Sequence, residues 1–278
     1  MLAIAVVLAS HVTTASADDP TVGHVVLRSF HSTAIAGTEH MAVYLPTGYD
    51  DRRRYPVIYA LHGLPSDDHG YRRFDAEAFG HAAERAGRPA IVVAPQGART
   101  GDRDPEWHDW GPGRDWETAV ASDLVHTVDG RFRTIRDRGA RALIGISAGG
   151  YGAAIIGVRH LRSFSVVQSW SGYFHPTNRA GTGPMDVGSP QADAAASVHT
   201  YVPALRRELR RLPTALGFYV GDRDTRFLAE NRRLHRELRA ARVAHRFAVY
   251  PGGHERSLWT AHMQDWVTDA VDALTRAR

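Results

Sequence analysis

The chain has 278 residues, of which 43% are hydrophobic and 23% are charged. These proportions are typical of a globular protein with a sizeable core, and they argue against a disordered chain. Cysteine is absent, which excludes disulfides, a cysteine nucleophile and thiolate metal sites. No linker or shift in composition divides the sequence, so we expect a single large domain.

The positive charge of the chain does not point to a nucleic-acid partner. The formal net charge is +4, but every basic residue is arginine and most are scattered. The densest run is Arg206-Arg207-Glu208-Leu209-Arg210-Arg211, which contains an acid and has helical spacing. No aromatic residues interleave with it as they do on a surface that stacks bases. We interpret the run as a solvated helix face and expect no nucleic-acid partner.

The N-terminus has the pattern of a secretory signal peptide. The apolar run Leu2–Ala9 is followed by Ala15-Ser16-Ala17, which fits an A-x-A cleavage site, and then by polar residues from Asp18 onward. Basic residues that usually precede such a run are missing, and an anchor or a buried first element is the alternative. The run is too short to span a bilayer. We therefore expect a signal peptide over residues 1–17, a secreted domain over residues 18–278 and no stable membrane insertion.

The predicted elements alternate between strands and helices along the chain. Strands are predicted at residues 22–30, 39–45, 55–61, 90–94, 141–146, 164–169, 215–220 and 246–250, and helices at 75–86, 116–132, from 148 onward, 227–243 and 257–276. This alternation predicts an α/β fold with a mainly parallel sheet and helices on both faces, after an antiparallel entry by the first two strands. Residues 178–203 have no clear period, so we expect an inserted cap or pocket segment there.

A serine lies on the turn between a buried strand and a helix rich in small residues. The five residues Gly145-Ile146-Ser147-Ala148-Gly149 match G-x-S-x-G, the pattern of a nucleophile elbow. The turn is tight enough for flanking side chains to collide, and glycine at both ends removes them. Alternatively, Ser147 only caps the helix at a glycine-rich corner.

Three polar residues follow strands in the order Ser147, Asp224, His254, which is the chain order of nucleophile, acid and base in α/β-hydrolases. A serine hydroxyl is a weak nucleophile until a neutral imidazole takes its proton. The imidazole in turn needs a carboxylate that fixes its tautomer. Asp222 lies close to Asp224, and we expect it to bond the turn backbone instead. The oxyanion donors of this fold are the amide after the nucleophile and one after an early strand, which Ala148 and Leu64 fit.

Four motifs, taken together, resemble the esterase D and antigen 85 type of α/β-hydrolase. They are His62-Gly63-Leu64, the glycine-rich run Gly145–Gly152, Gly221-Asp222-Arg223-Asp224, and Gly252-Gly253-His254-Glu255 with Trp259. The family includes feruloyl and acetylxylan esterases, S-formylglutathione hydrolases and mycolyltransferases, and the similarity covers nearly the whole chain after the signal peptide. The resemblance implies that Ser147 is the nucleophile, His254 the base and Asp224 the acid, with Leu64 and Ala148 as oxyanion donors.

We expect neither a metal site nor a cofactor. No H-E-x-x-H pattern is present, and we interpret Asp67-Asp68-His69 and the pair Asp102 and Asp104 as polar loops. Two tryptophans in the loop at residues 96–114, Trp107 and Trp110, have two equal interpretations. They line a pocket for a sugar or an aromatic acyl group, or they pack the loop.

The sequence therefore predicts a secreted serine hydrolase that cleaves a small-molecule or polysaccharide-linked carboxylic ester through an acyl-enzyme. One alternative is an acyltransferase that uses the same residues and a carbohydrate alcohol as acceptor. Another is a non-catalytic binding module, because a fold does not determine a function. The complete set of Ser147, Asp224 and His254 argues against a binding module.

Overall fold

The computed structural model describes residues 22–50, 52–102, 105–178, 181 and 183–274. The predicted signal peptide lies outside these residues. Among them, no helix is both long enough and apolar enough to cross a lipid bilayer.

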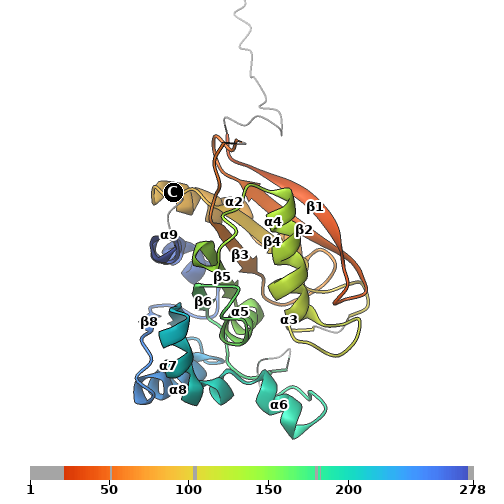
Figure 1. The fold of residues 1–278 in the computed structure, drawn as a ribbon. Helices are drawn as coiled ribbons and strands as arrows, with labels where there is room; N and C mark the ends of the chain where they lie inside the picture. Colours follow the sequence, from red (N-terminus) through yellow and green to blue (C-terminus); the bar gives the residue numbers. More distant parts are fainter. Residues whose placement is uncertain (1–21, 51, 103–104, 179–180, 182, 275–278) are drawn as a thin grey trace, which may run out of the picture.

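The core of the fold is one eight-stranded sheet (Figure 1). Its strands are β1 (His24–Ser32), β2 (Gly37–Leu45), β3 (Val57–Leu61), β4 (Ile91–Pro95), β5 (Arg141–Ile146), β6 (Val166–Trp170), β7 (Ala215–Gly221) and β8 (Arg246–Tyr250). They lie in the order β1-β2-β4-β3-β5-β6-β7-β8. β2 runs antiparallel to both β1 and β4, and all other pairs are parallel. The predicted α/β class with an antiparallel entry is confirmed.

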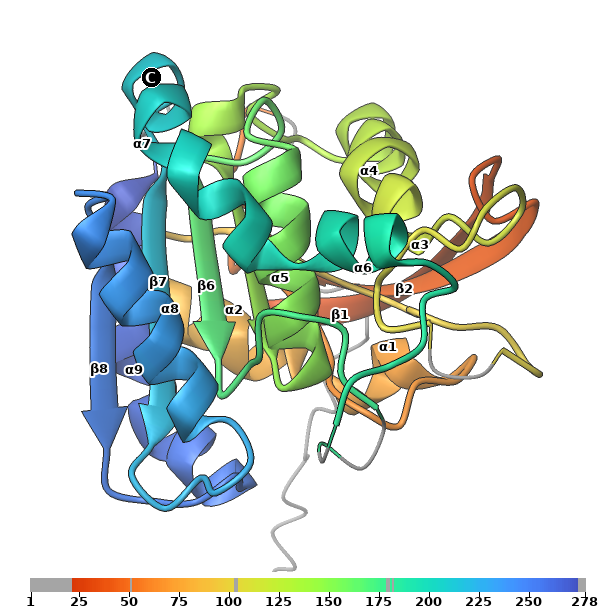
Figure 2. The same cartoon turned by 90° about the horizontal axis from the view of Figure 1, so that it is seen from below.

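Helices cover both faces of this sheet (Figure 2). They are α1 (Gly70–Arg73), α2 (Ala76–Arg85), α3 (Trp116–Thr118), α4 (Val125–Arg131), α5 (Ala148–Arg159), α6 (Pro190–Ala196), α7 (Val202–Arg211), α8 (Leu228–Ala240) and α9 (Arg256–Ala273), with shorter turns η1 (Ala119–Leu124), η2 (Arg138–Ala140) and η3 (Val198–Tyr201). α2 and α9 pack on one face, and α4, α5, α7 and α8 pack on the other.

The alternation of side chains along β3 explains why two helix layers are needed. Ile58 and Ala60 belong to the apolar cluster under α2 and α9, which also contains Trp266. Tyr59 and Leu61 point to the opposite cluster, under α5. Because every residue of β3 is buried, both faces of the strand must be covered.

The predicted helix over residues 116–132 is a run of three successive segments, α3, η1 and α4. The middle segment, η1, is a wider π-type turn. Asp123 in this turn accepts hydrogen bonds from the Ser32 hydroxyl at 2.7 Å and from the Ala34 amide at 3.1 Å. These bonds fasten the end of the β1–β2 hairpin to the helical layer.

The second half of the predicted inserted segment, residues 178–203, contains short helices. α6, η3 and the first residues of α7 lie there. Ser189 caps α6 by accepting a hydrogen bond from the Ala192 amide, and Pro190 occupies the first turn. These helices are too short to produce a detectable apolar period. The run Arg206–Arg211 is helical, and its arginines are exposed as predicted.

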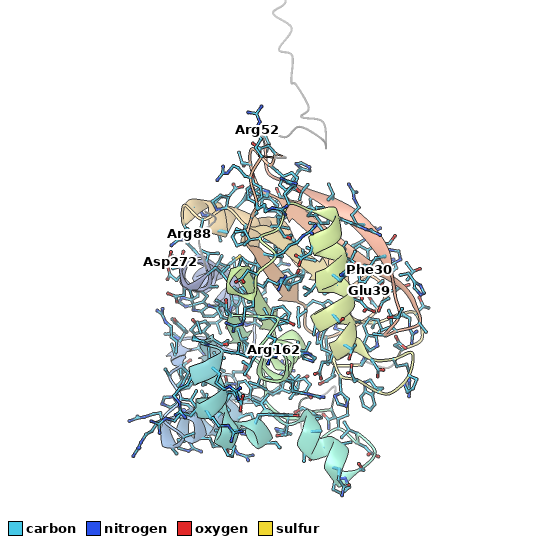
Figure 3. The ribbon with its side chains drawn as sticks, viewed as in Figure 1. Phe30, Glu39, Arg52, Arg88, Arg162 and Asp272 are labelled. Atoms are coloured by element: carbon cyan, nitrogen blue, oxygen red, sulfur yellow. The ribbon has the colours of Figure 1, made fainter. Side chains whose placement is uncertain are left out.

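The carboxyl group of Glu39 is buried in the sheet. Glu39 on β2 pairs in register with Phe30 on β1, and Figure 3 labels both residues. Its side chain is fully buried, and neither carboxyl oxygen has a hydrogen-bond partner among the described residues. Burial, and secondarily the negative charge of Asp123, raises the pKa of Glu39 from 4.5 to about 8.

Because the Glu39 carboxyl is buried, we expect the free energy of unfolding of the wild-type protein to fall as the pH rises. Glu39→Gln should remove this pH dependence. Between about pH 5 and 8 the folded protein keeps the Glu39 proton and the unfolded chain does not, so wild-type stability falls across this window. Relative to wild type, the free energy of unfolding of the variant should increase by up to about 1.4 kcal/mol for each pH unit across this window. Urea unfolding at pH 5, 6.5 and 8 measures this difference. The exposed Glu77→Gln is the control. A Glu39→Gln difference that is constant with pH contradicts the prediction.

Candidate active site

The turn between β5 and α5 holds Ser147 in an unusual backbone conformation. Its backbone angle φ is 58°, a value that residues other than glycine rarely adopt. A Cβ at Gly145 would lie 1.8 Å from the Gly149 carbonyl oxygen, and a Cβ at Gly149 would lie 2.0 Å from the Leu61 oxygen. Both distances are far inside contact range, so only glycine fits at these two positions. The predicted reason for the G-x-S-x-G pattern is confirmed.

The structure brings Ser147, His254 and Asp224 together in one hydrogen-bonded series. The Ser147 hydroxyl lies 2.9 Å from His254 Nε2, and His254 Nδ1 lies 2.8 Å from Asp224 Oδ2. The Asp224 side chain is fully buried, and that of His254 is 11% exposed. With Nδ1 donating to the carboxylate, Nε2 is free to accept the hydroxyl proton.

The two aspartates of the loop after β7 have different environments. Asp224 Oδ1 accepts hydrogen bonds from the amides of Arg226 and Phe227, each at 3.2 Å, which leaves Oδ2 for His254. Asp222 Oδ1 accepts from the Gly252 amide at 2.9 Å. Asp222 therefore bonds the backbone of the loop after β8, whereas the sequence predicted a bond to the backbone of its own turn. Of these two aspartates, Asp224 is the one that contacts the imidazole.

The two predicted oxyanion donors lie on segments that border Ser147. Ala148 is the first residue of α5, so its amide has no acceptor within the helix. Leu64 follows Gly63, where a Cβ would lie 3.0 Å from the Ser147 Cβ. The buried His62 ring contacts the Gln96 carbonyl oxygen at 2.7 Å and the Gly63 oxygen at 2.8 Å. These contacts fix the loop after β3 against the loop after β4.

A cavity of about 470 Å³ borders Ser147 and His254. Its aromatic and apolar lining side chains are Leu64, Phe74, Phe79, Ile146, Tyr173, Phe227, Trp259 and Met263, and the charged residues Asp75, Arg226 and Arg256 also line it. Phe227 and Trp259 meet the His254 ring edge to face at 5.1 and 5.3 Å. Of the predicted pocket segment, the described residues that line the cavity are Asn178 and Gly181. The helical part of that segment lies away from the cavity wall.

Sequence analysis did not identify most of this wall. Tyr173 and Phe227 come from loops after different strands, and their rings pack together at 4.8 Å. The only local signal was their position just beyond a strand end. Trp107 is fully buried and packs on His62 with ring centroids 5.0 Å apart. It therefore belongs to the core, and Trp110 packs in a separate cluster with Ile35 and Trp116.

The residues that the sequence places in polar loops make local polar contacts. His69 is 62% exposed and contacts its neighbour Asp68, which also accepts a hydrogen bond from Thr100. Ligand atoms of Asp67, Asp68 and His69 lie within 4.8 Å of one another, as exposed acidic groups often do. Asp102 pairs with Arg99, and Asp104 lies outside the described residues.

Comparison with known proteins identifies the family. Residues 32–270 match the model of the esterase family described as "Putative esterase". The chain belongs to this esterase family. Esterase Rv1288 of Mycobacterium tuberculosis strain H37Rv is 34% identical over 145 residues, which are 51% of this chain and 31% of that protein. The match thus spans about a third of the length of this curated relative.

Solved structures share the fold over nearly the full chain. A ferulic acid esterase superposes with a TM-score of 0.74 at 24% identity, covering 91% of this chain and 99% of the other. S-formylglutathione hydrolase from Staphylococcus aureus superposes with a TM-score of 0.71 at 18% identity, and the match covers 90% of this chain and 99% of the other. A ferulic acid esterase from Anaeromyces mucronatus, bound to ferulic acid, superposes with a TM-score of 0.70 at 17% identity, and the match covers 91% of this chain and 92% of the other. These likenesses establish the α/β-hydrolase fold.

The close contacts at the turn predict opposite effects for two glycine substitutions. Gly145→Ala forces backbone atoms apart and should destabilise the esterase fold by at least about 3 kcal/mol. Gly130→Ala, on the exposed side of α4 with open space around it, should stabilise by about 0.5–1 kcal/mol. Thermal unfolding followed by circular dichroism measures both. If Gly145→Ala and Gly130→Ala unfold at the same temperature, the prediction that only glycine fits at position 145 is contradicted.

Proposed function

We propose that the protein is a serine esterase that cleaves carboxylic esters through an acyl-enzyme intermediate. The observation that carries this proposal is the hydrogen-bonded series from Ser147 through His254 to Asp224, beside a cavity that reaches the serine. Membership of the esterase family supports it. A binding module has no need for a buried carboxylate that orients an imidazole toward a serine hydroxyl.

In the first half of the reaction, the Ser147 oxygen attacks the ester carbonyl while His254 Nε2 takes the hydroxyl proton. Asp224 stabilises the resulting imidazolium. The negative charge on the carbonyl oxygen is stabilised by the amides of Ala148 and Leu64, aided by the N-terminus of α5. The tetrahedral intermediate collapses, His254 passes the proton to the leaving alcohol, and the acyl group stays on Ser147.

In the second half, water takes the place of the alcohol. His254 removes a proton from the water, whose oxygen attacks the acyl carbonyl. The bond from the carbonyl carbon to the Ser147 oxygen breaks, and the serine regains a proton from His254. Asp224 keeps its charge throughout, because its role is to hold the imidazole and stabilise its cation.

The substrate we propose is a small-molecule or polysaccharide-linked ester with an apolar acyl group. The aromatic wall around Phe227 and Trp259 suits an acyl group that is itself aromatic or alkyl. The ferulic acid esterases of the same fold support an aromatic acyl group. We also propose that the chain is secreted, on the pattern of residues 1–17 alone.

Replacing the nucleophile should abolish ester hydrolysis. Ser147→Ala is expected to lower turnover of a short-chain aryl ester by roughly 10³-fold or more. It should also abolish labelling by a serine-directed phosphonate, detected by mass spectrometry. The exposed Ser122→Ala is the matched control and should keep wild-type turnover. If folded Ser147→Ala keeps more than about a tenth of wild-type activity, Ser147 is not the nucleophile.

Substitutions of the two aspartates after β7 should have different effects, one on turnover and the other on stability. Asp224→Asn is expected to lower turnover by roughly 10²- to 10⁴-fold, because the amide cannot hold the imidazole in its working tautomer. Asp222→Asn should keep turnover and mainly lower the unfolding temperature, because an amide oxygen accepts the bond from the Gly252 amide more weakly than a carboxylate does. Turnover and thermal unfolding are measured on both variants. The roles are reversed if Asp222→Asn is the inactive one.

A further inference from the structure

A compact group of two histidines and one glutamate lies apart from the catalytic series. His175 follows β6 by five residues, His199 lies in η3, and Glu230 is in the first turn of α8. Glu230 Oε1 lies 2.6 Å from His175 Nδ1 and 2.8 Å from His199 Nε2. Three segments that are distant in sequence therefore converge on one carboxyl oxygen.

The donor atoms of this group are those that a divalent transition metal prefers. Two imidazole nitrogens and one carboxylate oxygen form a common ligand set for zinc. Calcium and magnesium prefer oxygen ligands throughout, so the two imidazoles argue against them. One ligand atom from each of the three residues already lies within 4.8 Å of the others.

A fourth residue, Glu237, supplies the outer support that metal-binding histidines need. Its carboxylate is hydrogen-bonded to His199 Nδ1. This bond fixes the His199 ring with Nε2 aimed at Glu230, the arrangement seen in carboxylate–histidine–metal triads. Glu237 is itself held by Arg233 at 2.9 Å, one helical turn earlier in α8.

We propose that His175, His199 and Glu230 bind a zinc ion that joins the loop after β6, the η3 turn and α8. The His199 side chain is 9% exposed and that of Glu230 is 13% exposed, so the ion sits largely inside the protein. His175 is 36% exposed, which leaves room for a water molecule as the fourth ligand.

The movement required to admit the ion is small. Tetrahedral zinc with bonds of about 2.0–2.2 Å places neighbouring ligand atoms about 3.4 Å apart. The present nitrogen-to-oxygen distances of 2.6 and 2.8 Å must therefore increase by less than about 1 Å.

Metal binding is tested on the untagged full chain after dialysis against a chelator. Isothermal titration with zinc chloride and metal analysis should give one zinc per chain, and zinc should raise the unfolding temperature. His199→Gln and Glu230→Gln should each weaken zinc binding by at least about 100-fold, and Glu237→Gln by about 10- to 100-fold. Calcium chloride should neither bind nor compete.

His69→Gln is the matched control, because it removes a histidine from the exposed Asp67-Asp68-His69 group and should leave zinc binding unchanged. The proposal is overturned if wild type binds no zinc at one per chain, or if His69→Gln is the variant that loses it. If His199→Gln and Glu230→Gln fail to fold by circular dichroism, His175→Ala at the half-exposed position decides, and unchanged affinity there rejects the site. None of these measurements depends on esterase activity.

Discussion

The backbone at Ser147 imposes a steric constraint on which the rest of the site depends. A φ of 58° turns the chain from β5 directly into α5 and leaves no space for side chains at Gly145 and Gly149. The helix start therefore packs on the end of β3, where Leu61 touches it. As a result, the loop that follows β3, with Gly63 and Leu64, is brought beside the serine. Ser147 and the expected oxyanion donors are thus positioned by one contact between the start of α5 and the end of β3.

A second close backbone contact positions Asp224 and His254. A Cβ at Gly221 would lie 2.2 Å from the Gly252 carbonyl oxygen, so the loops after β7 and β8 touch through their main chains. Asp222 adds a hydrogen bond across the same contact. Asp224 and His254 then face each other from these two loops, and burial of the Asp224 carboxylate strengthens their interaction. Glycines at both contacts let the parallel strands present three side chains at one sheet edge.

The cavity wall is built from other segments than the hydrogen-bonded series of Ser147, His254 and Asp224. Its aromatic residues come from α1–α2, from the loops after β6 and β7 and from α9, so each can change without moving Ser147. Phe227 links the two parts, since it packs on both Tyr173 and His254. α8 begins just after Phe227, and Glu230 in its first turn is the centre of the proposed zinc group. None of the three proposed zinc ligands lines the cavity itself.

Local sequence patterns were enough to predict the features that depend on neighbouring residues. Strand and helix periods predicted the order of elements, and the glycine spacing around Ser147 predicted the tight turn, because both follow from local backbone geometry. The three residues of the proposed triad could be selected because parallel strands bring their carboxyl ends to one edge. Four features became visible only in the folded chain: Trp107 lies in the core, Phe227 lines the cavity, the Glu39 carboxyl is buried without a hydrogen-bond partner among the described residues, and His175 meets His199 and Glu230. These outcomes depend on contacts between segments far apart in the chain, which leave no regular spacing in the sequence.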